Sequence, residues 1–223
     1  MVTVSFMILG MVFIVCLIVS NLLETKILMI GPVTTTAGLL LFPVSYIIND
    51  CISEVWGFKK ARLVIWSAFA MNFMVVGVAQ LAVVLPAAPF WEGGDHFNFV
   101  FGLTPRIVTA SLCAFLAGSF INAYVMSKMK ISSQGRNFSL RAIVSTLAGE
   151  SADSLIFFPI AFGGLIPADN LLIMIGTQAA LKSVYEIIAL PVTIRVVRYV
   201  KKIEGQDVYD TAISFNPFKI RDI

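Results

Sequence analysis

The fold class of this chain is decided near its start, where residues 4–23 read VSFMILGMVFIVCLIVSNLL without one charged side chain. An α-helix rises about 1.5 Å per residue, so about 20 such residues cross the roughly 30 Å hydrocarbon core of a bilayer. The rest of the chain is similar, because 58% of its 223 residues are hydrophobic and only 13% are charged. A soluble domain carries about 25% charged residues. The composition predicts an integral membrane protein and excludes a disordered chain, a nucleic-acid reader and an ordinary soluble enzyme.

Five further apolar runs follow the first, separated by short loops. They lack the alternating ten-residue segments of an outer-membrane β-barrel. The sequence therefore predicts an all-α, polytopic membrane bundle of six transmembrane helices over residues 1–202, with a cytoplasmic C-terminal tail over residues 203–223. The predicted spans are residues 4–23, 37–49 (with a polar helical extension to residue 56), 63–85, 107–127, 140–162 and 171–197.

The basic residues predict the orientation of the bundle. Thirteen of the sixteen lie in the loops after spans two and four or from the end of span six onward, and the others are Lys26, Arg106 and Lys182. Because cytoplasmic loops carry the excess of lysine and arginine, we expect both termini in the cytoplasm. Two groups of three spans would then be inverted relative to each other, which is compatible with the 3+3 inverted repeat of many transporters, although the two halves share few residues.

Span five carries two acidic residues inside its apolar run. Glu150 and Asp153 are three residues apart and lie on one helical face. A charge in the bilayer costs about 2.5–3.5 kcal/mol on insertion scales, so such residues usually face the bundle interior and mark a functional site. Two carboxylates one turn apart repel each other unless a cation, a proton or a ligand intervenes. The alternative is that they bond to Lys182 or Arg106 and only lock the helix packing.

Span six places Lys182 and Glu186 four residues apart, at a depth that matches the two acids of span five. They either neutralise each other along the helix or line a polar cavity that could also relay protons.

Near the inner end of span two, Asp50 and Glu54 share a face and Asn49 lies beside them. Pro43, one turn earlier, is expected to loosen the helix and free backbone carbonyls for a ligand. The alternative for the two acids is interfacial pairing with the basic residues that follow them, namely Lys59, Lys60 or Arg62.

Span four repeats small residues at four-residue spacing, at Ala110, Ala114 and Gly118, with Asn122 one step further. Such a face indicates close helix packing, which is compatible with a homodimer and equally with packing inside one chain. The chain has no G-x-x-x-x-G-K-[ST] motif, no HExxH motif and one histidine, so we expect no ATP hydrolysis, no bound metal or cofactor and no enzymatic activity.

Three stretches carry a specific combination of motifs. They read FPVSYIINDCISEVWGFKKARLVIW (residues 42–66), RIVTASLCAFLAGSFINAYVMSKMK (106–130) and RNFSLRAIVSTLAGESADSLIFFPIAF (136–162). The combination resembles the queuosine precursor transporter family of bacterial membrane proteins. The resemblance implies secondary, ATP-independent uptake across the inner membrane. Its substrates would be 7-deazaguanine bases, usually 7-cyano-7-deazaguanine and 7-aminomethyl-7-deazaguanine, the precursors of the modified tRNA base queuosine.

Such a substrate fits the polar residues. A guanine-like edge offers two adjacent N–H donors, which one carboxylate accepts as a bidentate pair. We expect Glu150 or Asp153 to do this, while amide or ammonium donors meet the ring carbonyl and aromatic side chains stack on the base. The candidate substrate-binding residues are Glu150, Asp153, Asn49, Asp50, Glu54, Asn122, Lys182, Glu186, Phe157 and Tyr46, with Phe42 and Phe158 as further stacking candidates.

Two other functions compete with a secondary transporter. One is the substrate-capture S-component of an ATP-driven uptake complex for the same or a related ligand. The other, a membrane enzyme or assembly factor, gains no support from the motifs. In each case the expected partners are a small molecule and the lipid bilayer, and not nucleic acid.

Overall fold

The computed structural model describes residues 3–23, 26–30, 33–102, 105–164, 167–211 and 213–219, and most of them are helical. The predicted helical class is confirmed, although a short antiparallel hairpin that the sequence did not predict pairs Ile27 with Thr36. The elements are α1 (Val4–Leu23), β1 (Ile27–Ile30), β2 (Val33–Thr36), the 3-10 helix η1 (Ala37–Leu40), α2 (Phe42–Trp56), α3 (Phe58–Val84), α4 (Gly94–Phe101), α5 (Pro105–Ser132), α6 (Phe138–Phe162) and α7 (Ala168–Glu204).

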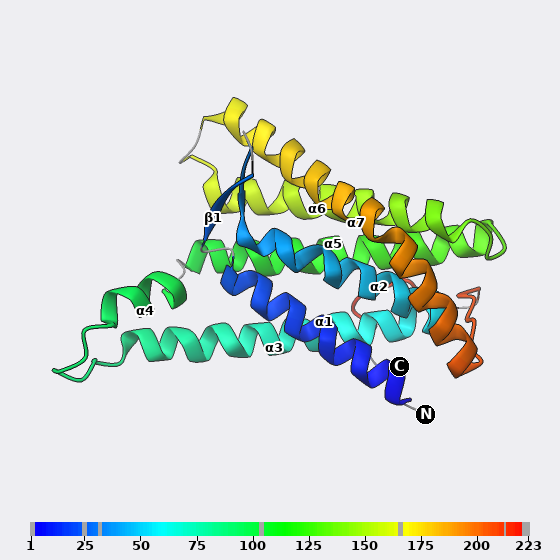
Figure 1. Ribbon diagram of the computed structural model, residues 1–223, viewed down its shortest axis with the longest axis horizontal. Coiled ribbons are helices and arrows are strands. Elements are labelled where there is room, and N and C mark those ends of the chain that lie inside the picture. Colours follow the sequence, from blue (N-terminus) through cyan, green and yellow to red (C-terminus); the bar gives the residue numbers. More distant parts are fainter. Residues whose placement is uncertain are drawn as a thin grey trace.

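Five helical segments in the described part of the chain are long and apolar enough to cross a membrane. They match the first five predicted spans and lie in α1, η1 with α2, α3, α5 and α6. The sixth prediction falls on α7, a 37-residue helix that carries Lys182 and Glu186 in its middle and runs the length of the bundle (Figure 1). Apolar side chains of α1 and α3, such as Met7 and Phe73, remain exposed, as helices that face lipid require.

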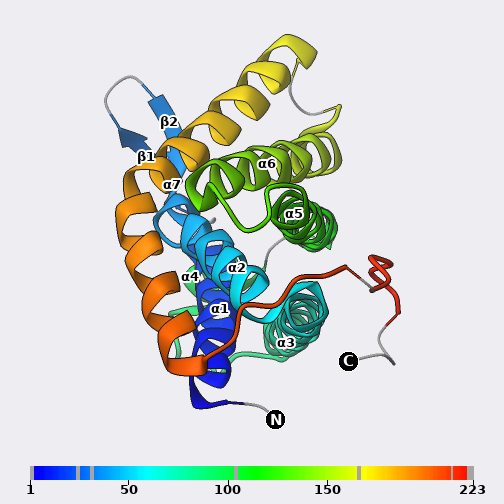
Figure 2. The ribbon, with the colours of Figure 1, turned by 90° about the vertical axis from the view of Figure 1, so that its right-hand side faces the viewer.

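Helix α2 lies at the centre of the bundle, among α1, α3, α5 and α7 (Figure 2). All of its residues except Val44 and Ile47 are buried, including its acids and amides. Pro43 lies in the first turn of α2, where the missing N–H has no cost, so it starts the helix. The expectation that Pro43 loosens the helix interior is therefore wrong.

Helices α5 and α6 form an antiparallel pair that packs closely at two glycines. A Cβ atom on Gly118 would lie 2.9 Å from the backbone oxygen of Gly149, and one on Gly149 would lie 2.8 Å from Cε1 of Tyr46. Ala110 and Ala114 on the same face of α5 are buried as well. The small-residue face thus serves packing inside the chain, which is the second of the two alternatives.

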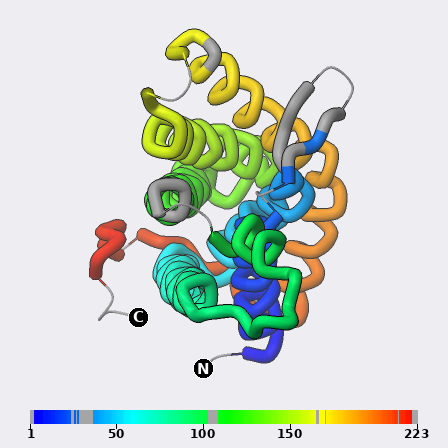
Figure 3. The backbone as a smooth tube through the Cα atoms, turned by 90° about the vertical axis from the view of Figure 1, so that its left-hand side faces the viewer, coloured from blue at the N-terminus to red at the C-terminus, as the bar shows by residue number. Residues whose placement is uncertain are grey.

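The two ends of the bundle differ. The start of α1, the α2–α3 junction, the α5–α6 turn and the C-terminal segment lie at one end (Figure 1). Strands β1 and β2, α4, the end of α6 and the start of α7 lie at the other end, which faces the viewer in Figure 3. The first end is the one at which the sequence gathers the loops rich in lysine and arginine.

The C-terminal strap, which we define as residues 205–211 and 213–219, packs on the α2–α3 junction. Asp210 accepts the backbone N–H of Phe58 at 2.8 Å and so caps the start of α3. The N–H of Val208 donates to the Val55 carbonyl, and the Trp66 indole donates to the Pro217 carbonyl at 2.8 Å. The tail predicted from residue 203 therefore begins one residue before the end of α7, and it is attached to the helical bundle.

Candidate functional site

Four helices bring polar side chains together inside the bundle. We call this group the central polar cluster. None of its members is more than 7% exposed. The buried positions follow from helical spacing, since residues three or four apart face the same neighbour. The cluster consists of Tyr46, Asn49 and Asp50 from α2, Asn122 from α5, Ser145, Thr146, Glu150 and Asp153 from α6, and Lys182 and Glu186 from α7.

Lys182 joins the two acids of α6. Its ammonium nitrogen lies 3.0 Å from Oε2 of Glu150 and 2.9 Å from Oδ2 of Asp153. The Phe42 ring covers the same nitrogen, 3.9 Å from the ring centroid. The ion pairs that the sequence allowed between these acids and Lys182 are thus present. The other expected partner was Arg106, whose side chain lies outside the described residues. One ammonium neutralises only one of two ionised carboxylates, and Oε1 of Glu150 has no hydrogen-bond donor in the described part of the chain.

Asp50 and Glu186 form a second acidic pair, between α2 and α7. Asp50 accepts a long hydrogen bond of 3.4 Å from the Ser145 hydroxyl. Its other oxygen and both oxygens of Glu186 have no hydrogen-bond donor among the described residues. The predicted neutralisation of Glu186 by Lys182 along α7 is absent from the described ion pairs, because Lys182 turns to α6.

The amides of the cluster are used unequally. Asn49 donates to the side-chain oxygen of Asn122 at 2.7 Å and to the Ser119 carbonyl at 3.1 Å, so both of its N–H groups bind α5. The side-chain nitrogen of Asn122 and the hydroxyl of Tyr46 are buried without a hydrogen-bond partner in the described part. Asn49 thus holds α2 against α5, while Asn122 and Tyr46 keep polar atoms that a ligand could use.

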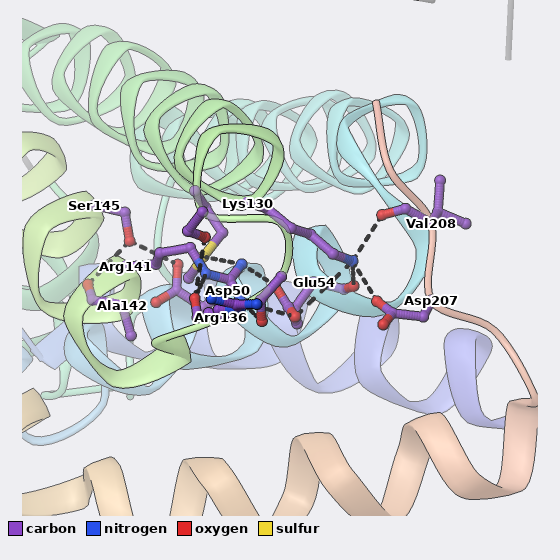
Figure 4. A network of polar contacts seen from close by, with 12 residues as sticks. Asp50, Glu54, Lys130, Arg136, Arg141, Ala142, Ser145, Asp207 and Val208 are labelled. Atoms are coloured by element: carbon purple, nitrogen blue, oxygen red, sulfur yellow. Dashed lines mark hydrogen bonds and ion pairs between the residues drawn. The ribbon is translucent and has the colours of Figure 1, made fainter. Parts of the chain in front are cut away.

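Glu54 is engaged elsewhere, in an ion-pair network at the basic end of the bundle (Figure 4). Arg141 binds it with two guanidinium nitrogens, one of them at 3.0 Å, and Lys201 lies 2.6 Å from Oε1. Lys130 donates to the Glu54 carbonyl and pairs with Asp207 of the strap. The partners of Glu54 are therefore not Lys59, Lys60 or Arg62, the residues expected for interfacial pairing.

Asp207 connects the strap to this network. Partial burial raises its pKa, but hydrogen bonds from Lys130 and Lys201 outweigh that effect and hold the pKa below its ordinary value. A carboxyl group with a lowered pKa stabilises the folded state above about pH 4 and loses that contribution as the pH falls through the lowered value. The strap is therefore held by ionised groups throughout the physiological pH range.

Comparison with known proteins places this geometry in a family. The family model described as "Putative vitamin uptake transporter" matches residues 36–196. The chain belongs to this family. The matched segment runs from the hairpin to the last third of α7 and contains every residue of the central polar cluster.

Curated relatives carry a more specific name, which confirms the resemblance drawn from the sequence. A "Probable queuosine precursor transporter" of Bacillus subtilis is 27% identical over 77% of this chain and 76% of its own length. A "Queuosine precursor transporter" of Escherichia coli is 29% identical over 57% of this chain and 55% of its own length. The relative in Haemophilus influenzae is also 29% identical, over 57% of this chain and 52% of its own length. The match thus spans about half the length of the last two relatives, and no solved structure matches the chain significantly.

The aromatic candidates lie in two places. The ring of Phe157 is half-buried and contacts the rings of Phe158 and Phe162 near the end of α6. Phe42 contacts Tyr46 at a centroid separation of 5.7 Å and covers Lys182. Phe42 and Tyr46 are therefore the aromatic residues that border the charged part of the cluster.

Sequence reasoning missed the hydroxyl residues of the cluster. Ser145 and Thr146 lie one turn before Gly149 and Glu150, so the four-residue spacing on α6 was the available signal. It was weak, because serine and threonine in membrane helices commonly bond to their own backbone, as Ser145 also does at 2.9 Å to Ala142.

Proposed function

We propose that this chain is a secondary transporter that imports queuosine precursors across the bacterial inner membrane. The expected substrates are 7-cyano-7-deazaguanine and 7-aminomethyl-7-deazaguanine. The observation that carries the proposal is the buried polar cluster, whose unpaired acceptors and donors lie inside a protein of this family. Buried polar groups without partners cost about 1–3 kcal/mol each, so a ligand that completes them binds favourably.

The base would bind next to Lys182. In this proposal Glu150 accepts the two adjacent N–H groups of the guanine-like edge. Oε1, which has no hydrogen-bond donor in the described residues, accepts one, and Oε2, which also lies 3.0 Å from Lys182, accepts the other. The side-chain nitrogen of Asn122 donates to the ring carbonyl, and Asp153 keeps Lys182 in place. Phe42 and Tyr46 supply stacking surfaces, worth about 1–3 kcal/mol per base.

The transport step uses the two groups of three spans, with α7 as the sixth span. Helix α2 belongs to the first group and α6 and α7 to the second, so the cluster lies where the groups meet. Movement of one group against the other would open the cluster to each side in turn. The basic end of the bundle, which holds the Glu54 network, would face the cytoplasm.

Uptake in cells that cannot make the precursor tests this proposal. The readout is queuosine in tRNA after feeding each deazaguanine base, with guanine and queuine as competitors. We expect Glu150→Gln to lower uptake about tenfold or more, because one charge-assisted bidentate interaction is lost. Asp95→Asn on the exposed helix α4 serves as the matched control and should transport normally. Normal uptake by Glu150→Gln at equal expression would remove Glu150 from the site.

Purified protein in liposomes separates the transporter from the S-component. Flux of the base without any other protein supports the transporter. Tight binding without flux would assign the chain to substrate capture for an ATP-driven complex.

A further inference from the structure

We propose that Asp50 and Glu186 share one proton and that this proton crosses the membrane with each substrate molecule. The pair would thereby couple uptake to the proton gradient. The inference deepens the proposed function and rests on it, because a coupling proton requires a transported substrate.

The geometry places two carboxyl groups face to face in the interior. Asp50 on α2 is fully buried and Glu186 on α7 is 1% exposed, and the two groups lie within hydrogen-bonding reach of each other. No ion pair joins either of them to a basic residue in the described part of the chain. Two oxygens from facing carboxylates can form a hydrogen bond only when one of them carries a proton.

Electrostatics requires that proton. Two buried carboxylates in contact do not both ionise, because desolvation and mutual repulsion each disfavour the second charge. Carboxyl pairs of this kind titrate as a unit and hold a single proton over a wide pH range. The Asp50–Glu186 pair differs here from Glu150 and Asp153, which have Lys182 as their cation.

Two neutral side chains beside the pair have hydrogen-bond donors that no other described residue accepts in good geometry. The hydroxyl of Thr146 lies next to Glu186, and the amide nitrogen of Asn122 lies next to Asp50. Both side chains are at least 98% buried, and neither of these atoms has a hydrogen-bond partner of good geometry in the described residues. They can donate to whichever carboxylate is ionised, so the site accommodates the proton on either acid.

The helices packed around Asp50 and Glu186 place no cation in an ion pair with either acid among the described residues. Lys182, one turn away on α7, is held by α6. Helix α5 contributes the uncharged Asn122. The other acids and weak acids around the pair are Tyr46, Cys51 and Glu54 on α2 and Glu150 and Asp153 on α6. The nearest other cations, Arg141 on α6 and Lys201 on α7, are bound to Glu54.

The position of the pair explains how a proton would be coupled to transport. Asp50 belongs to the first group of three spans and Glu186 to the second, so a movement that separates the groups also separates the two acids. Once apart and hydrated, each carboxyl group returns to an ordinary affinity for protons, and the shared proton leaves to the side that has opened. The empty transporter returns with both carboxylates ionised and hydrated by the water that replaces the base, so one proton moves inward with each base and none moves back.

The experiment uses the purified full chain in liposomes and the uncharged 7-cyano base as the probe. Two rates are measured: exchange of labelled base without a gradient, and accumulation driven by an alkaline interior with the membrane potential clamped and sodium replaced by choline. Wild-type protein should accumulate the base toward about tenfold per pH unit for one proton per substrate. In Glu186→Gln and Asp50→Asn, accumulation should no longer respond to the pH gradient at whatever rate of exchange remains, and the exposed control Glu92→Gln should behave as wild type.

The outcomes distinguish this inference from the proposed function. A wild-type protein that neither exchanges nor accumulates the base contradicts the function itself. Wild-type exchange without a response to the pH gradient, accumulation that needs sodium, or a Glu186→Gln protein that still accumulates the base would each overturn proton coupling and leave the function intact.

If a variant does not exchange labelled base, infrared spectroscopy tests the shared proton directly. The infrared carbonyl band of protonated, buried carboxyl groups should be weaker in the Asp50→Asn, Glu186→Gln double variant than in the folded wild-type protein at neutral pH, because the shared proton can lie on either acid. A band that is unchanged in this variant would show that the proton is not held by the pair.

Discussion

Lys182 neutralises two carboxylates that would otherwise repel each other at the centre of the bundle, at distances of 3.0 and 2.9 Å. We expect Lys182→Met to lower the free energy of unfolding by about 3–5 kcal/mol, because breaking a buried ion pair leaves uncompensated charge. Thermal unfolding in detergent measures the change. Lys59→Met, in the partly exposed first turn of α3, is the control and should change little. Adding Glu150→Gln and Asp153→Asn to Lys182→Met should restore most of the stability, and a single variant as stable as wild type would contradict this account.

Residues three or four apart on one helix show how far helical spacing can predict a site. Helical spacing correctly placed Glu150 and Asp153 on one interior face, because one side of α6 packs inward. It placed Asp50 and Glu54 together for the same reason, yet their partners differ. Helix α2 is surrounded by neighbours, so residues one turn apart meet Glu186 of α7 in one case and Arg141 of α6 with Lys201 of α7 in the other. Spacing identifies a face of a helix but not the side chains that lie opposite that face.

At the scale of elements, the α5–α6 crossing depends on two glycines. A methyl group on Gly149 would lie 2.8 Å from Cε1 of Tyr46 and 2.9 Å from both Cβ of Asn122 and the Gly118 carbonyl. We expect Gly149→Ala to lower the unfolding free energy by about 1–3 kcal/mol, because α2, α5 and α6 must all move apart. Gly176→Ala on α7 meets open space and is the matched control. Thermal unfolding of both variants checks the prediction, which fails if the two glycines tolerate alanine equally.

The ends of the helices and the short elements were not predictable from local sequence. The apolar runs predicted five helices that the structure contains, because length and hydropathy are properties of the segment itself. Helix α3, however, starts at Phe58 instead of the predicted residue 63, since Asp210, which caps it, lies about 150 residues away. The β1–β2 hairpin and α4 were missed because short elements in loops carry weak patterns, and their stability depends on tertiary contacts.

At the scale of the whole molecule, the two ends of the bundle have different chemistry. The end with the α2–α3 junction carries the Glu54 network and the strap, where Arg141, Lys130 and Lys201 are tied to carboxylates. The other end carries α4 and the loop before it, whose Phe90 and Trp91 are exposed. An exposed Trp beside apolar helices is typical of a membrane interface. The charge asymmetry therefore predicts a direction for the molecule in the membrane, with the strap end toward the cytoplasm.

That direction predicts which residues an impermeant thiol reagent can reach. Cys16 and Cys51 are buried, so replacing the exposed Cys113 with Ser gives a background in which the remaining thiols are protected. In intact cells, Glu92→Cys before α4 should react with the reagent, whereas Gln206→Cys in the strap should react only after the membrane is permeabilised. Both positions are exposed in the structure, so a difference in labelling reports the side of the membrane and not burial. The reverse pattern would turn the bundle over, place the Glu54 network outside, and require the proton of Asp50 and Glu186 to enter from the strap end.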